Sequence, residues 1–141
     1  MKIQCRLKWM LIVISLTLLC SCQSNLAKKK RFQAFAGYVE NNNLKKIPQI
    51  NAFVFQGCEA LDNKHLVVLT NQGRSYLLTL ITFCNDANYA PNISFKQAVG
   101  GRLSTTFDAV IVNGQHCYIK TIHQVNQQHR NELSGLVKKT R

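Results

Sequence analysis

Two apolar segments joined by a short turn limit the possible folds of this chain more than any other part of its sequence. Residues 65–70 and 75–81 are rich in Leu, Val, Tyr and Ile, and residues 71–74 between them contain Asn and Gly. A four-residue connection of this composition between two such segments is typical of a β-hairpin. Because a short turn reverses the direction of the chain, the sequence predicts an antiparallel sheet.

Further strand-like segments surround this hairpin. The dipeptide Asn113-Gly114 is a strong turn signal, and apolar side chains alternate in the segment that follows it. Two consecutive glycines, Gly100 and Gly101, indicate another turn. We expect strands at residues 51–55, 65–70, 75–81, 102–107, 109–112 and 117–123, with turn-rich segments at 57–63 and 85–92.

Helical spacing replaces the strand pattern at both ends of this region. The apolar residues Phe32, Phe35, Ala36 and Val39 recur on one helix face, and residues 126–139 show a weaker helical pattern. The predicted fold class is therefore α+β and mainly β. It consists of a small antiparallel sheet of five to six strands, an N-terminal helix and a short C-terminal helix.

The first 21 residues have the pattern of a secretory signal. Basic residues precede an apolar run at residues 9–19, which is shorter than the roughly 20 residues that span a bilayer. The run ends in Leu19-Cys20-Ser21-Cys22, which resembles a bacterial lipobox. A plain signal peptide cut nearby and an uncleaved anchor are the alternatives.

The lipobox resemblance implies a lipid-modified Cys22 at the mature N-terminus. Gln23, in place of Asp, favours the outer membrane, with the domain facing the periplasm of the cell envelope. The expected partners are the membrane, through Cys22, and other envelope proteins. The predicted domains are a signal peptide at 1–21, a basic tether at 22–31, a β-rich domain with a leading helix at 32–125, and a basic C-terminal helix or tail at 126–141.

The net charge of +12 by itself suggests a nucleic-acid-binding protein. Three of the basic residues lie in the signal segment, however, and two clusters at 28–31 and 138–141 hold seven more. The segment 47–137 is nearly neutral and offers no basic stripe interleaved with aromatic residues. We therefore expect no nucleic-acid partner, and a basic segment that approaches anionic headgroups instead.

Three cysteines remain after processing, namely Cys58, Cys84 and Cys117. Cysteines of exported proteins usually form disulfides, and an odd number indicates one pair and one free thiol. A Cys84–Cys117 bond is preferred, because each residue borders an apolar strand segment. Cys58 is then the free thiol, either buried or paired with another chain.

The candidates for chemistry are few. Cys58, with His65 and Asp62 close by in the sequence, offers a thiol-dependent hydrolase as an alternative function, which requires hydrogen-bonded geometry between these side chains. The possible metal ligands match no zinc spacing. They are His116, Cys117, His123 and His129. We therefore expect no catalytic residue, no metal and no cofactor.

The leading hypothesis is a non-enzymatic envelope protein with a binding or structural role. An alternative is a small-ligand or peptidoglycan binder that uses aromatic side chains on a solvent-facing sheet surface. Tyr76 and Phe95 are the candidates for that binding face.

Several features between residues 50 and 125 occur in an order that resembles a family of small bacterial lipoproteins, the domain of unknown function 6491. They are the aromatic strand at 53–55, the hairpin of 66–70 and 76–80, Cys84, and the segments 90–94, 101–110 and 117–122. The resemblance also supports the Cys84–Cys117 pair, whereas Cys58 is additional to the family pattern. It implies no activity.

Overall fold

The computed structural model describes residues 23–85, 87 and 92–139. The expected signal peptide at 1–21 and the lipidation residue Cys22 lie outside the described residues. The described chain contains two helices and nine strands. Among the described residues, neither helix has the length and apolar character needed to cross a membrane. The predicted α+β, mainly β fold class is confirmed.

The main sheet is antiparallel, with its principal strands in the order β3-β4-β5-β9-β8-β6 and β1 paired to β9. A separate two-stranded sheet pairs β2 with β7. The strands are β1 (Lys46–Ile47), β2 (Gln49–Asn51), β3 (Phe55–Ala60), β4 (His65–Thr70), β5 (Ser75–Leu80), β6 (Ile93–Lys96), β7 (Arg102–Ser104), β8 (Ala109–Val112) and β9 (Gln115–Val125).

The main sheet curves until its two edge strands approach each other. The ring of Phe95 on β6 lies 5.0 Å from the ring of Phe55 on β3 and 5.0 Å from that of Phe53. Aromatic side chains thus bridge the gap between the edges, and the sheet is nearly closed around an apolar interior. That interior contains Leu66, Val68, Tyr76, Leu78, Leu80 and Ile119, among others.

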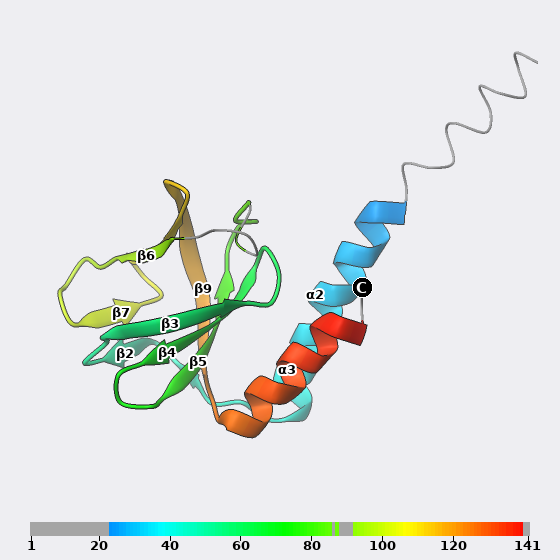
Figure 1. The fold of residues 1–141 in the computed structure, drawn as a ribbon, viewed down its shortest axis with the longest axis horizontal. Helices are drawn as coiled ribbons and strands as arrows, with labels where there is room; N and C mark the ends of the chain where they lie inside the picture. The colour runs from blue at the N-terminus through cyan, green and yellow to red at the C-terminus, as the bar shows by residue number, and fades with distance from the viewer. Residues whose placement is uncertain (1–22, 86, 88–91, 140–141) are drawn as a thin grey trace, which may run out of the picture.

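The two helices cover the outer face of this sheet. Helix α2 (Gln23–Asn41) and helix α3 (Gln127–Lys139) lie side by side (Figure 1). Side chains alternate between the two faces of a strand. Every second residue of these strands therefore points to the interior, and the residues between them point to the helices. This second core contains Phe35, Leu44, Leu61, Val67, Leu77, Val125 and Leu133.

Local sequence signals explain where helix α2 ends and where helix α3 begins. Asn43 has a φ of 47°, and the N–H groups of Asn43 and Leu44 donate to the carbonyls of Glu40 and Val39. This is the Schellman arrangement that terminates many helices. At the start of α3, Oδ1 of Asn126 accepts the N–H of His129 at 2.8 Å, as a helix N-cap does.

The segment 22–31, expected to be a tether, is helical from Gln23. Residues 23–31 are thus the first part of helix α2, and their role as a tether stays a prediction. Ala, Lys, Arg and Gln are good helix formers, so a basic run can propagate a helix that docks further along. The predicted C-terminal helix or tail is helix α3.

Two strand boundaries also differ from expectation. Ala52 has a φ of 49°, which is incompatible with an extended strand. Strand β2 therefore ends at Asn51, and β3 begins only at Phe55. As a result, β3 occupies part of the segment that was expected to be turn-rich. Strand β6 was not predicted at all. By contrast, Asn113 and Gly114 both have positive φ, as the predicted hairpin turn requires.

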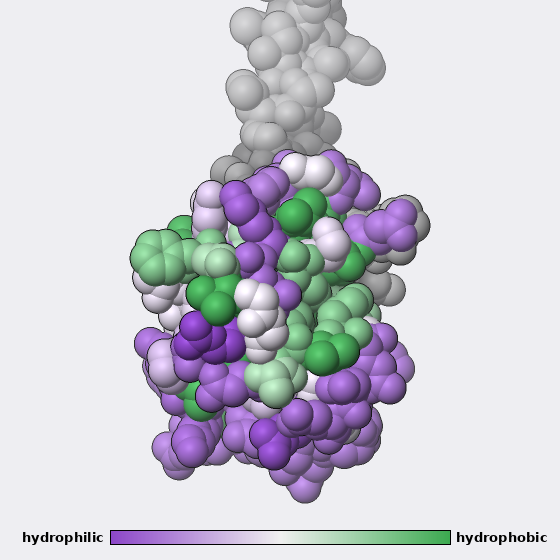
Figure 2. Space-filling view, turned by 90° about the vertical axis from the view of Figure 1, so that its left-hand side faces the viewer, coloured by the Kyte–Doolittle hydropathy of each residue, from purple (hydrophilic) through white to green (hydrophobic). Residues whose placement is uncertain are grey.

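Apolar side chains also gather on the surface at the β6–β7 end of the sheet. Figure 2 shows them as several patches with polar residues between and around them. The connections next to β3 and β7 contribute large exposed side chains, namely Val54, Val99 and Phe107.

Candidate functional site

The candidate site is a groove between α2 and the outer face of the sheet, with a cavity volume of about 180 Å³. Helix α2 provides a mostly apolar wall, and strands β4, β5 and β9 provide polar side chains. The lining residues are Phe32, Phe35, Ala36, Val39, Glu40, His65, Thr79, Lys120, Thr121 and His123. The groove therefore joins residues that are distant in sequence.

Strand register determines which polar groups meet in the groove. Thr79 on β5 lies opposite His65 on β4 and opposite Thr121 on β9. One row further along, His123 on β9 lies opposite Leu77. Residues that form such cross-strand rows are on one face of a sheet, and this face lies beneath α2.

His65 is held at the floor of the groove by two kinds of contact. Its ring lies 4.6 Å from the ring of Phe35, and its Nδ1 lies 2.9 Å from Oδ1 of Asp62. Oδ1 of Asp62 also accepts the backbone N–H groups of Lys64 and His65, both at 2.7 Å. Asp62 therefore contacts Nδ1 of the imidazole, and the other ring nitrogen, Nε2, has no hydrogen bond to this carboxylate.

The same contacts control the charge of Asp62. Burial by itself raises the pKa of this carboxyl, but the hydrogen bond and charge of His65 and the two backbone N–H groups outweigh it, so that the pKa is lowered. Asp62 thus remains a carboxylate that orients the imidazole of His65.

His123 is the unusual member of the groove, because it is 8% exposed and its Nδ1 has no hydrogen-bond partner among the described residues. Burial, together with the positive charge of Lys46 on the neighbouring strand β1, lowers the pKa of His123. Its imidazole is therefore neutral near pH 7. A buried polar atom without a partner costs about 1–3 kcal/mol, so a group that bonds Nδ1 would be favourable there.

Charged residues of both signs lie at the mouth of the groove. Glu40 on α2 and Lys120 on β9 are exposed lining residues, and these two side chains do not form an ion pair with each other. Thr79 and Thr121 also line the groove and add two hydroxyl groups. The groove thus combines an apolar wall, hydroxyl groups, a neutral imidazole, a carboxylate and an ammonium group.

Cys58 and His65 lie on opposite faces of the sheet and do not meet. Cys58 on β3 packs against the interior core, whereas His65 packs against α2. Burial, followed by the negative charge of Glu59, raises the pKa of the Cys58 thiol to about 12. Because the thiolate is the nucleophilic form, this position does not favour thiol chemistry.

The proposed aromatic binding face of Tyr76 and Phe95 is not exposed as predicted. Tyr76 is 5% exposed and belongs to the interior core with Leu78 and Leu80. Phe95 packs between Phe53 and Phe55. This prediction was wrong, because the alternation along β5 turns Tyr76 inward and the closure of the sheet encloses Phe95.

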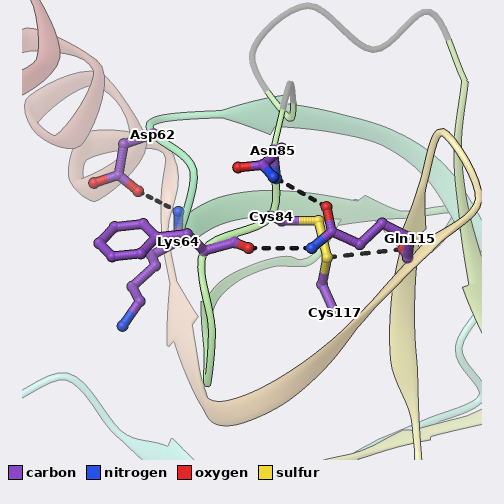
Figure 3. Close-up of a disulfide and its surroundings, with 7 residues drawn as sticks. Asp62, Lys64, Cys84, Asn85, Gln115 and Cys117 are labelled. Atoms are coloured by element: carbon purple, nitrogen blue, oxygen red, sulfur yellow. Dashed lines mark hydrogen bonds between the residues drawn. A yellow bond between two sulfur atoms is a disulfide. The ribbon is translucent and has the colours of Figure 1, made fainter.

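The structure joins Cys84 to Cys117, the preferred pair, with 5.8 Å between their Cα atoms. The side chain of Gln115 supports this bond from one side (Figure 3). Its Oε1 accepts the N–H of Asn85 at 3.1 Å, and its Nε2 donates to the carbonyl of Phe83 at 3.3 Å. The backbone on both sides of Cys84 is thus tied to β9, while Cys58 is a free thiol.

The residues that the sequence offered as possible metal ligands do not lie together. Within the described part of the chain, no three His, Cys, Asp or Glu side chains are grouped so that they could hold a metal ion. Cys117 is used in the disulfide, and His116 is exposed whereas His123 faces α2.

The groove was not predicted from the sequence, although part of its signal is present there. His65 and His123 each lie two residues from a buried apolar residue of the same strand, Val67 and Val125 respectively, which places them on the helix-covered face. What no local pattern indicates is that α2 docks there and leaves a cavity. In the sequence, the two histidines consequently look like isolated polar residues.

The fold and groove together define a mainly β protein: a nearly closed antiparallel sheet whose outer face carries two helices and a small polar cavity. The chain belongs to a family of unknown function, DUF6491, whose match extends over residues 5–141. The match to this family of unknown function thus extends well beyond residues 50–125, on which the resemblance was drawn. Comparisons with curated proteins and with solved structures gave no match.

Proposed function

We propose that this protein is a lipid-anchored protein of the bacterial cell envelope that acts by binding a small ligand and carries out no catalysis. The anchor is supported by the signal pattern of residues 1–21 and the lipobox that ends at Cys22. Because α2 begins at Gln23, an acyl group on Cys22 would place the domain directly at the membrane surface. Gln23 favours the outer membrane, with the domain in the periplasm.

The observation that carries the binding role is the buried, unpartnered Nδ1 of His123, a residue that lines the groove beneath α2. The cavity volume of about 180 Å³ is smaller than the roughly 300–1,000 Å³ of pockets that hold drug-sized ligands. An occupant of about the size of an amino acid fits this volume. An apolar part against α2 and a polar group that bonds His123 would match the lining.

The lack of an assembled nucleophile among the described residues supports binding over catalysis. Cys58 faces the interior, and no hydrogen bond joins His65 to the hydroxyl of its cross-strand neighbour Thr79. Nucleophilic catalysis requires that kind of contact between the nucleophile and its base. In a strain lacking the gene, a Cys58→Ser variant should therefore restore the parental phenotype, and a phenotype equal to deletion would contradict the proposal.

Mass spectrometry of the mature N-terminus tests the anchor. The protein isolated from the membrane fraction should begin at Cys22 and carry acyl chains, and Cys22→Ser should abolish the modification. Cys20→Ser is the matched control and should leave it intact. An unmodified Cys22 in the mature protein would contradict the lipoprotein assignment.

Native mass spectrometry of protein purified in mild detergent tests the groove. We expect a bound small molecule that is lost in Ala36→Trp, because Ala36 lines the groove and an indole there would occupy it. Gln33→Trp, an exposed position on the same helix outside the groove, is the matched control. Retention of the molecule in Ala36→Trp would place the ligand elsewhere.

A further inference from the structure

A second surface lies beside the groove, at the N-terminal half of α2. Here three separate segments form an open hollow of about 340 Å³. Helix α2 contributes Lys28, Lys29 and Phe32, the β3–β4 turn contributes Lys64, and the segment after β5 contributes Phe83. We call these five residues the basic-aromatic surface.

Lys64 lies at the centre of the basic-aromatic surface. Its Nζ is 4.6 Å from the ring centre of Phe83 and 5.3 Å from that of Phe32. Phe83 is 54% exposed and Phe32 is 37% exposed. The ammonium group is thus held between two rings that remain open to solvent, and such contacts are cation–π interactions.

The position of Phe83 is determined by the disulfide region. Its neighbour Cys84 is bonded to Cys117 and donates its N–H to the carbonyl of Asn63 at 2.7 Å. The carbonyl of Phe83 accepts from Gln115 (Figure 3). An exposed aromatic side chain on a backbone anchored in this way is preorganised for an external contact.

The charge of the basic-aromatic surface has one sign. Among the described residues that line it or the adjoining hollow, the only acidic one is Asp62, and the carboxylate of Asp62 is engaged by His65 and two backbone N–H groups. Lys28 and Lys29 are exposed. The surface therefore offers ammonium groups for an anionic partner, with two apolar rings between them.

We propose that the basic-aromatic surface docks onto anionic phospholipid headgroups. Lysines attract anionic lipid surfaces, and aromatic rings and lysine stems enter the boundary between headgroups and acyl chains. The surface begins at Lys28, six residues after Cys22, so the proposed lipid anchor would hold it close to the membrane. The docked orientation rests on the proposed anchor.

A depth measurement on the reconstituted full chain tests this docking. Trp9 is the only tryptophan in the sequence, so Trp9→Phe combined with Phe83→Trp gives a single reporter on the surface. In vesicles of phosphatidylcholine and phosphatidylglycerol with brominated acyl chains, we expect strong quenching of that reporter. Quenching should decrease in phosphatidylcholine alone and at high salt, because salt screens the attraction.

A reporter at the other end of the sheet provides the control. Phe107 is 69% exposed and lies in the connection after β7. Trp9→Phe combined with Phe107→Trp should show little quenching in either kind of vesicle. Equal quenching at positions 83 and 107, or none at position 83 in anionic vesicles, would overturn the proposal.

Substitutions that remove single positive charges identify the lysines that contribute to docking. Lys28→Gln and Lys64→Gln should each weaken the docked state about fivefold, the equivalent of roughly 1 kcal/mol per basic residue near an anionic surface. Lys96→Gln, at an exposed position on β6, is the matched control and should have no effect. Equal weakening by all three variants would show that net charge alone, and not this surface, drives the association.

These experiments distinguish docking of the basic-aromatic surface from lipidation of Cys22. The test uses the unprocessed full chain, in which the apolar segment 9–19 can attach the protein to the vesicle without acyl chains on Cys22, so an unmodified Cys22 leaves the quenching test valid. A soluble polyanion such as heparin distinguishes lipid from other anionic partners. If heparin shifts the emission of the Phe83→Trp reporter while anionic vesicles leave it unquenched, the surface binds polyanions and the lipid proposal is overturned.

Discussion

Oδ1 of Asp62 lies 2.9 Å from Nδ1 of His65, and the same oxygen accepts the N–H groups of Lys64 and His65 at 2.7 Å. This single carboxylate therefore shapes the β3–β4 turn and positions a groove histidine. It also connects the two proposed surfaces, since Lys64 belongs to the basic-aromatic surface and His65 to the groove.

Asp62→Asn should destabilise the protein by about 1–3 kcal/mol at pH 7, because it removes charge-assisted hydrogen bonds from a mostly buried group. The pKa of Asp62 is lowered from 3.8, so its contribution is present above that pH and is lost as pH falls through the folded pKa. Urea unfolding at pH 7 and pH 3 measures both effects. Glu40→Gln, an exposed acid on α2, is the control; an equal loss at both pH values would contradict the linkage.

His123→Leu should flatten the pH dependence of stability between pH 7 and pH 5. The folded pKa of His123 is lowered from 6.5, so the unfolded chain takes up a proton first and the parent loses stability as pH falls below that value. At pH 7.5 the variant should be as stable as the parent or up to about 3 kcal/mol more stable, because an unpartnered buried nitrogen is removed. Thermal unfolding across this range tests the expectation, and the exposed His116→Leu should keep the parental profile.

Loss of the disulfide should lower stability by about 4 kcal/mol, as the chain-entropy relation gives for a sequence separation of 33. The double variant Cys84→Ser with Cys117→Ser, compared with the parent by urea unfolding without reductant, measures this loss. Cys58→Ser keeps the bond and is the control. Alkylation of Cys84 in the unreduced protein would show that the bond does not form.

Leu133→Ala should cost about 2–5 kcal/mol, because Leu133 is fully buried between α3 and the sheet. The matched change Leu26→Ala removes the same atoms from a side chain that is 56% exposed on α2, and should cost no more than about 0.5 kcal/mol. Denaturant unfolding of the two variants compares them directly. Similar values would mean that α3 does not pack as described.

Much of the sheet follows from local patterns. Strand β4 begins and ends where the apolar segment 65–70 does, and the turn at 113–114 has the backbone that Asn-Gly favours. Strand β6 was missed although Ile93-Ser94-Phe95-Lys96 alternates apolar and polar residues, because a run of four residues is the shortest that indicates a strand. The break at Ala52 was missed because Ala gives no signal for a positive φ.

The site was less predictable than the strands. The sequence places Asp62 and His65 three residues apart, and their contact forms within one turn. It also places Cys58 close to both, yet the alternation of side chains directs Cys58 into the interior while His65 faces α2. Proximity along a strand is therefore a poor guide to a shared site, because neighbouring residues can occupy opposite faces.

The mainly β class, the hairpin of β4 and β5, and the concentration of charge at the two ends follow from the amino-acid sequence, since all of these depend on local composition and period. Three other features arise from the packing of distant segments: the sheet closes on Phe95, α2 covers His65 and His123, and Lys64 contacts Phe83. These contacts depend on strand register and on the docking of the helices. Burial of the combined apolar surface selects that arrangement, and no single segment encodes it.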